Sequence, residues 1–183
     1  PAIAETMARM LGTEKDSDLK VQLIISLGLL GEKSPSVVQA LADVLTQSDA
    51  ELRLRAARVL GTFGTDAAPA ADALLKAAEA DAVAEVRVNA LRAFGSALGP
   101  ALKGRTADVI RVLEKDPDHE VRQVAVEELG ALGPELKDDA EALKTLRKRL
   151  SDPHIKVREA AAAAIRKIEK KPEPKKDSDK KTP

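Results

Sequence analysis

Five basic side chains recur along this chain, each one residue after an apolar residue and just before a stretch rich in Ala, Val and Leu. They are Lys20, Arg53, Arg87, Arg122 and Arg158, at successive steps of 33, 34, 35 and 36 residues. The guanidinium fork of Arg can bond a carboxylate through two parallel hydrogen bonds, which suits an Arg at a helix start to hold a carboxylate in a turn. We therefore interpret these residues as structural. A repeat of this length also predicts stacked supersecondary units.

Few residues in the sequence could carry out catalysis. The carboxylate pairs Glu127-Glu128 and Asp138-Asp139 have the chemistry of general acids, but adjacent helical residues point about 100° apart and cannot face one substrate. We interpret them as charges on a solvated helix face and at a helix start. The chain has two His and no Cys, which leaves neither a nucleophilic triad nor thiolate zinc ligands. We predict no enzyme activity, no metal site and no cofactor.

The composition limits the classes of ligand. Of the 183 residues 44% are apolar, yet there are only two Phe and no Trp or Tyr, so the interior is built from aliphatic residues and an aromatic-lined pocket is disfavoured. Thirty basic and thirty acidic residues cancel, and no global field attracts the chain to DNA or anionic membranes. The apolar run 23–30 is too short to cross a bilayer.

Each repeat carries the signals of two helices. In the second repeat Pro35 opens one amphipathic run, and Gly61 and Gly64 close the next, which is the usual asymmetry of helix ends. Apolar residues recur at three- and four-residue steps within these runs. The pattern predicts an all-α fold, an α-solenoid of about five helix pairs. The ten predicted helices span 2–12, 17–30, 35–46, 49–63, 69–80, 83–98, 104–115, 118–132, 138–150 and 153–170.

The two ends of the sequence differ from its middle. We assign residues 1–170 to the solenoid domain and expect 171–183, a Lys- and Pro-rich segment without apolar residues, to be a disordered tail. The chain begins at Pro1 inside a predicted helix, so we expect a processed or trimmed product that a signal peptide or further repeats could precede. An upstream repeat or a dimer contact could cover the apolar side of the first helix. Neither the compartment nor the oligomeric state follows from the sequence.

Two segments point to a known family. The sequences DPDHEVR at 116–122 and DPHIKVR at 152–158 both lead into helices rich in Ala. Residues 1 to about 170 thereby resemble HEAT repeats, particularly the bacterial HEAT-like class first noted in phycobilin lyases. In that family an acidic residue six before the Arg is implied to bond the Arg of its own or an adjacent repeat, which forms a ladder. The residues at this place are Glu14, Gln47, Asp81, Asp116 and Asp152, and Gln47 departs from the acidic pattern.

Some HEAT-like proteins are enzymes, but their site residues are missing from this sequence. Deoxyhypusine hydroxylase is implied to build a di-iron site from several His-Glu dyads, whereas this chain has one, His119-Glu120, and we interpret His119 as exposed in a turn. HEAT-like DNA glycosylases are implied to use aromatic residues and a basic concave face, which this chain does not offer. No residue supports phycobilin lyase activity. The resemblance therefore implies a binding scaffold.

One polar cluster is a candidate binding site. In a solenoid of helix pairs the second helices line one surface. The second and fifth residues after each of the five recurring basic residues, which we call anchors, point away from the core. In the two central repeats these positions hold Arg55, Arg58, Asn89 and Arg92. They could hold an acidic peptide, a phosphate or a nucleic-acid backbone. Alternatively they are solvated, with Glu51 bonding Arg55 at the four-residue helical spacing.

Three functions remain for this sequence. We favour a non-enzymatic scaffold that binds a protein or peptide along its second helices. The first alternative is nucleic-acid or phosphate binding through Arg55, Arg58 and Arg92. The second alternative is an accessory repeat module of a larger enzyme.

Overall fold

The computed structural model describes residues 2–169, which form ten α-helices and three short 3-10 helices without a strand. The predicted disordered tail lies outside the described residues. The helices are α1 (Ala2–Thr13), α2 (Ser17–Leu30), α3 (Pro35–Val44), α4 (Ala50–Phe63), η1 (Gly64–Ala70), α5 (Ala71–Ala80), α6 (Ala84–Leu98), η2 (Gly99–Arg105), α7 (Thr106–Lys115), α8 (His119–Ala131), η3 (Gly133–Leu136), α9 (Ala140–Arg149) and α10 (Ile155–Glu169).

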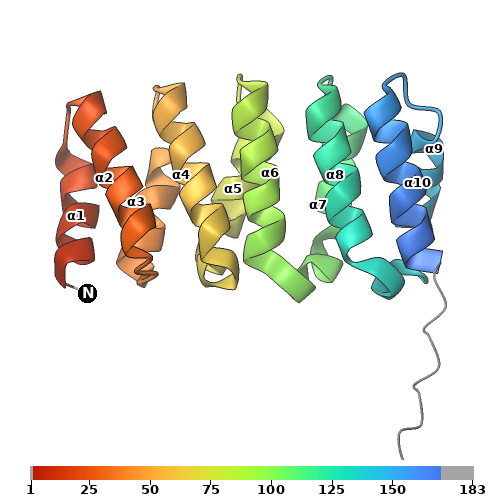
Figure 1. Ribbon diagram of the computed structural model, residues 1–183, viewed down its shortest axis with the longest axis horizontal. Coiled ribbons are helices and arrows are strands. Elements are labelled where there is room, and N and C mark those ends of the chain that lie inside the picture. Colours follow the sequence, from red (N-terminus) through yellow and green to blue (C-terminus); the bar gives the residue numbers. More distant parts are fainter. Residues whose placement is uncertain (1, 170–183) are drawn as a thin grey trace, which may run out of the picture.

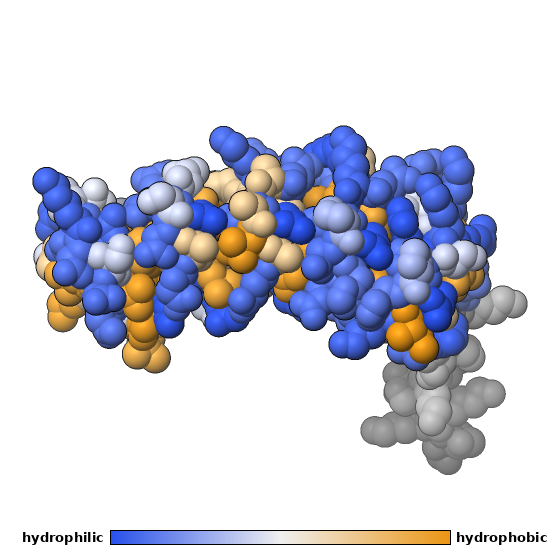
Figure 2. Space-filling view, turned by 90° about the horizontal axis from the view of Figure 1, so that it is seen from above, coloured by the Kyte–Doolittle hydropathy of each residue, from blue (hydrophilic) through white to orange (hydrophobic). Residues whose placement is uncertain are grey.

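The helix pairs stand side by side in chain order, from α1 and α2 at one end of the row to α9 and α10 at the other (Figure 1). The second helices of the pairs, α2, α4, α6, α8 and α10, pack on one another, and substantial contacts join only elements of the same or neighbouring repeats. The α-solenoid prediction is thus confirmed. Seen from above, the row exposes a mainly hydrophilic surface, with hydrophobic residues at the surface near both ends and in the middle (Figure 2).

The connections between pairs differ from the prediction in the last three repeats. Helices were expected to start at 69, 104 and 138, but α5, α7 and α9 begin two residues later and are preceded by η1, η2 and η3. These 3-10 turns start at glycines with positive φ, namely Gly64, Gly99 and Gly133. A proline lies in each turn. Pro100 and Pro134 stand at the start of η2 and η3, where the missing N–H leaves no hydrogen bond unmade, whereas Pro69 lies inside η1. The prolines therefore belong to the 3-10 turn rather than to the first turn of the α-helix.

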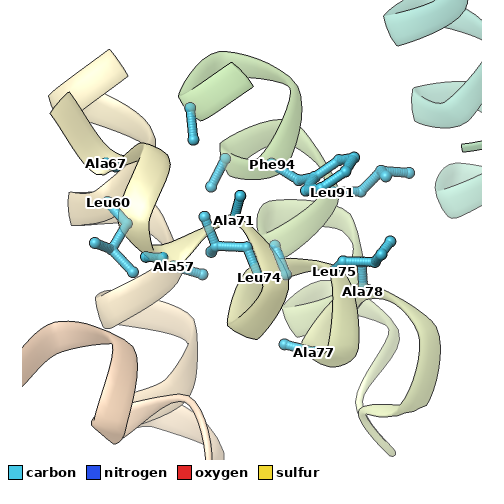
Figure 3. Close-up of a cluster of buried hydrophobic side chains, with 14 of the residues drawn as sticks. Ala57, Leu60, Ala67, Ala71, Leu74, Leu75, Ala77, Ala78, Leu91 and Phe94 are labelled. Carbon is cyan, nitrogen blue, oxygen red and sulfur yellow. The ribbon is translucent and has the colours of Figure 1, made fainter. Parts of the chain in front are cut away.

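The core is a continuous aliphatic strip that runs the length of the row. Figure 3 shows its central part, to which Leu60 of α4, Leu74 of α5 and Phe94 of α6 contribute, and each of these residues is 0% exposed. Small residues let neighbouring second helices approach closely. A Cβ added at Gly130 would lie 3.0 Å from the Cα of Ala164, so α8 and α10 are almost in backbone contact. A single helix pair could not bury both of its faces, which is why the pairs stack.

Three of the second helices start with an aspartate cap. The side chains of Asp16, Asp49 and Asp118 accept hydrogen bonds from backbone N–H groups in the first turns of α2, α4 and α8. The equivalent residue of α6 is Val83, which has the same extended backbone but no capping side chain and is 39% exposed. We therefore expect Val83→Asp to stabilise the protein by about 1 kcal/mol. Urea unfolding followed by circular dichroism measures the change, with Asp118→Ala as the opposite control; an unchanged midpoint for Val83→Asp would contradict the capping argument.

Candidate binding surface and the rungs that support it

A hydrogen-bonded contact joins each pair of neighbouring repeats through the turns that precede the second helices. We call each such contact a rung. It joins the basic anchor of one repeat to the turn residue six positions before the next anchor. The rungs are Lys20–Gln47, Arg53–Asp81, Arg87–Asp116 and Arg122–Asp152.

The three Arg rungs share one geometry. In each, Nε and Nη2 of the Arg donate to the two carboxylate oxygens of the Asp, at 2.6 to 3.0 Å. Nη1 donates instead to the backbone carbonyl six residues earlier in its own repeat, for example from Arg87 to Asp81. Each Asp thus accepts from the preceding repeat through its side chain and from its own repeat through its carbonyl. A continuous chain of hydrogen bonds therefore links all five repeats.

The rung carboxylates are almost fully buried. The side chains of Asp81, Asp116 and Asp152 are 4%, 5% and 0% exposed. Burial raises the pKa of Asp81, but the hydrogen bonds from Arg53 and from the Val83 N–H outweigh it and leave the pKa below its ordinary value. The pKa of Asp152 is lowered in the same way, with Arg122 and the His154 N–H opposing burial. Both carboxylates therefore stay ionised in the fold and stabilise it at neutral pH.

The first rung is weaker, because Lys20 Nζ makes one hydrogen bond of 2.8 Å to the amide oxygen of Gln47. This neutral acceptor is the residue that departs from the acidic pattern. Gln47 still accepts through its backbone carbonyl from Arg53, so the chain of hydrogen bonds is unbroken.

The structure brings three of the four candidate binding residues together. Arg58, Asn89 and Arg92 line a groove of about 410 Å³ between α4 and α6, whose floor is formed by small residues: Ala57, Gly61, Ala93 and Ser96, with Thr62 beside them. The fourth candidate, Arg55, lies one turn away on α4 and does not line the groove.

Each Arg of this cluster already has a carboxylate partner. Arg55 is paired with Glu51 on its own helix at 2.6 Å. Arg58 donates to Glu85 at 2.8 Å and to Asn89 at 3.3 Å, and Arg92 is paired with Glu127 at 3.0 Å. These pairs are about half exposed, so the Arg side chains remain accessible, but the partner carboxylates cancel much of the positive potential that a nucleic-acid backbone would need.

Of the carboxylate pairs in the sequence, Asp138-Asp139 precedes α9, and Glu127-Glu128 lies within α8, where the two side chains point in different directions. Asp139 caps α9 and accepts a hydrogen bond from Thr106, whereas Glu127 pairs with Arg92. Glu128 instead lies against Gly95 of α6, where a Cβ would be 2.6 Å from its Cδ. Burial raises the pKa of Glu128 to about 7, with Arg92 opposing and Glu127 adding to the shift. Sequence reasoning missed this half-buried carboxylate, and Gly95, a glycine in the middle of a helix, is the signal that could have revealed it.

The two histidines, His119 and His154, are neighbours in space, although no sequence pattern connected them. The rings of His119 and His154 stack with centroids 3.6 Å apart. Burial and the adjacent His119 lower the pKa of His154. Over residues 2–169 no group of three or more His, Asp or Glu side chains is arranged to hold a metal ion. Nor does that part of the chain contain a helix that is long and apolar enough to span a membrane.

The fold and the rungs define an α-solenoid repeat protein. Its family follows from a comparison with family models, in which the model for HEAT repeats matches residues 4–95 and 106–177. The chain belongs to the HEAT-repeat family.

Solved structures share the fold. Two engineered proteins from the Northeast Structural Genomics Consortium are each 22% identical to this chain, with TM-scores of 0.67 and 0.65. The matches cover 90% and 91% of this chain and 78% and 48% of theirs. The archaeal HEAT-like repeats protein from Thermococcus onnurineus NA1 is 17% identical, with a TM-score of 0.55 over 90% of this chain and 65% of that protein. No curated protein matches the sequence.

Proposed function

We propose that this chain is a non-enzymatic scaffold that binds a peptide segment of a partner protein in the groove between α4 and α6. The observation that carries the proposal is the groove itself, because a floor of small residues admits a peptide backbone between two polar helices. Arg58 and Arg92 stand at the groove, each about half exposed.

The chemistry of the groove favours a peptide with an acidic side chain. A guanidinium has five N–H donors, and within residues 2–169 Arg92 pairs with a carboxylate only through Nη2, to Glu127. The donors that remain can take a carboxylate of the ligand in a bidentate pair. The charge already supplied by Glu85 and Glu127 disfavours a polyanion, so a short peptide fits this surface better than a nucleic acid does.

The test is a selection of peptides from a displayed random library on the full chain, followed by titration of the enriched peptides. We expect the enriched peptides to contain Asp or Glu and to lose about tenfold or more in affinity with Arg58→Gln plus Arg92→Gln. The matched control is Arg111→Gln, because Arg111 on α7 also pairs across repeats, with Glu79 at 2.5 Å, but lies outside this groove.

Two results would count against the proposal. One is a library that yields no binder, and the other is a set of binders that the double variant and the Arg111 control affect equally. Labelled single-stranded and duplex DNA, titrated at low salt, test the nucleic-acid alternative. Tight binding to DNA that charge reversal at Arg58 and Arg92 abolishes would replace the peptide with a phosphate backbone as the ligand.

A further inference from the structure

Each end of the ladder of rungs carries one half of a rung, and the two halves are complementary. At the C-terminal end, Nη1 of Arg158 bonds the carbonyls of Asp152 and Pro153, just as Nη1 of Arg122 bonds Asp116 and Pro117. Within residues 2–169 no carboxylate reaches Nε or Nη2 of Arg158, the two atoms that hold the Asp in every other Arg rung. In the described part of the chain the last anchor is therefore a half-rung without an acid.

The N-terminal end offers the missing acid. Glu14 stands six residues before Lys20, in the turn position of the rung carboxylates. Its Oε1 accepts from the Asp16 N–H, two residues on, as the carboxylate of Asp81 accepts from Val83. No basic side chain of the described residues donates to Glu14. In the rungs the Arg always belongs to the preceding repeat, so a rung to Glu14 needs an Arg that packs against the outer side of the first helix pair.

A second observation at the N-terminal end is an uncovered core position. Leu52, Val86, Val121 and Val157, each one residue before an anchor, are no more than 2% exposed. Leu19 holds the same position in the first repeat but is 41% exposed. Leu19 belongs to the first helix pair of the described residues, whereas the other four positions each lie in a repeat that packs on a preceding pair. Ile3 and Met10 of α1 are also exposed, at 70% and 43%, and hydrophobic residues reach the surface near this end (Figure 2).

The net charges of the two ends are also opposite. Residues 140–169 carry eight Lys and Arg against four Asp and Glu, a net charge of +4. Residues 2–30 carry three basic and four acidic side chains, a net charge of −1. Charges of opposite sign on two surfaces favour their encounter and fix their orientation.

We infer that two copies of this chain stack head to tail, with Arg158 of one copy completing a rung to Glu14 of the next and Leu19 covered at the junction. The interface uses the ends of the row and not the groove between α4 and α6, so it is independent of the proposed peptide site. Because each copy keeps one open half at either end, the contact is heterologous and propagates to longer rows rather than closing as a two-fold dimer.

One residue limits the strength of this junction. Position eight after the anchor is Gly28, Gly61, Gly95 and Gly130 in the first four repeats, where it lets the next second helix approach, but it is Arg166 in α10. The Arg166 side chain keeps α10 and the α2 of the next copy further apart than α8 and α10. The association is therefore weak and reversible, and Arg166→Ala should tighten it.

Sedimentation velocity of the full chain over a hundredfold range of concentration tests the inference. We expect species larger than a dimer at high concentration. Arg158→Glu or Glu14→Arg should weaken the association about tenfold or more. An equimolar mixture of these two variants should associate again, because every junction between unlike copies then joins opposite charges. Lys103→Glu, an exposed charge reversal in the middle of the row, is the matched control.

The mixture also separates a direct contact from misfolding, since two damaged folds would not restore each other. A wild-type chain that stays monomeric at every concentration overturns the inference. Association that survives both single variants, or a mixture that fails to recover it, overturns it as well.

Discussion

Arg53→Met is expected to destabilise the protein by ~3–5 kcal/mol, because it leaves a buried carboxylate without its cation. The Asp81 side chain is 4% exposed and takes both of its Arg hydrogen bonds from Arg53. The same substitution removes the donor to the backbone carbonyls of Gln47 and Ser48. Urea unfolding followed by circular dichroism measures the loss. Because repeats of a solenoid are held together only by their neighbours, the two sides of the broken rung should unfold less cooperatively.

The controls for this prediction lie on the same helix and in the same rung. Arg58→Met also removes an Arg of α4 that bonds the next repeat, but its pair with Glu85 is more than half exposed on both sides, so the expected loss is under about 1 kcal/mol. Adding Asp81→Asn to Arg53→Met removes the stranded charge and should recover much of the stability. Equal losses for Arg53→Met and Arg58→Met would show that burial of the rung contributes nothing.

The acid response of the protein follows from the same rungs. The pKa values of Asp81 and Asp152 lie below their ordinary value in the fold, so the stability that they contribute is complete above about pH 4 and is lost as the pH falls through their folded pKa values. Glu128 has the opposite effect, because its pKa is raised and its contribution to stability falls as the pH rises.

The sequence predicted those parts of the structure that depend on local pattern. Helix periodicity and the spacing of the basic anchors were sufficient for the order of the ten helices, because each repeat packs only on its neighbours and long-range topology adds no further choice. Contacts between repeats were harder. The pair of Arg55 with Glu51 lies within one helix and follows from four-residue spacing, whereas Arg58 bonds Glu85, 27 residues away. That contact depends on the offset between α4 and α6, which no local pattern encodes.

The sequence pattern also could not predict which single polar residues are withdrawn from water. Glu127 and Glu128 are adjacent and chemically identical, yet one pairs with Arg92 and the other lies against Gly95. A rotation of about 100° between successive helical residues decides which of them meets the next helix. The sequence interpretation of both residues as solvated was therefore wrong for Glu128.

Replacing Glu128 by the neutral isostere Gln is expected to stabilise the protein by ~2–3 kcal/mol above pH 7. The pKa of Glu128 is about 7 in the fold against an ordinary 4.5, chiefly because of burial. The folded protein therefore keeps a proton that the unfolded chain has already released. The contribution of Glu128 to stability is therefore most favourable below pH 4.5, falls as the pH rises to about 7, and is constant above. In the Gln variant this slope is absent, so the two proteins should differ little at pH 4.5 and most at pH 8.

Urea unfolding at pH 4.5, 6 and 8 measures this difference. Gly95→Ala is a second, independent test of the desolvation of Glu128. A Cβ at position 95 displaces only the flexible end of Glu128, which moves the carboxylate toward water and returns its pKa toward 4.5. Gly95→Ala should therefore abolish much of the pH slope while also gaining about 1 kcal/mol of helix propensity. If the wild-type protein and the Gln variant keep a constant difference in stability from pH 4.5 to pH 8, then the Glu128 carboxylate is not desolvated and the contact with Gly95 does not govern its ionisation.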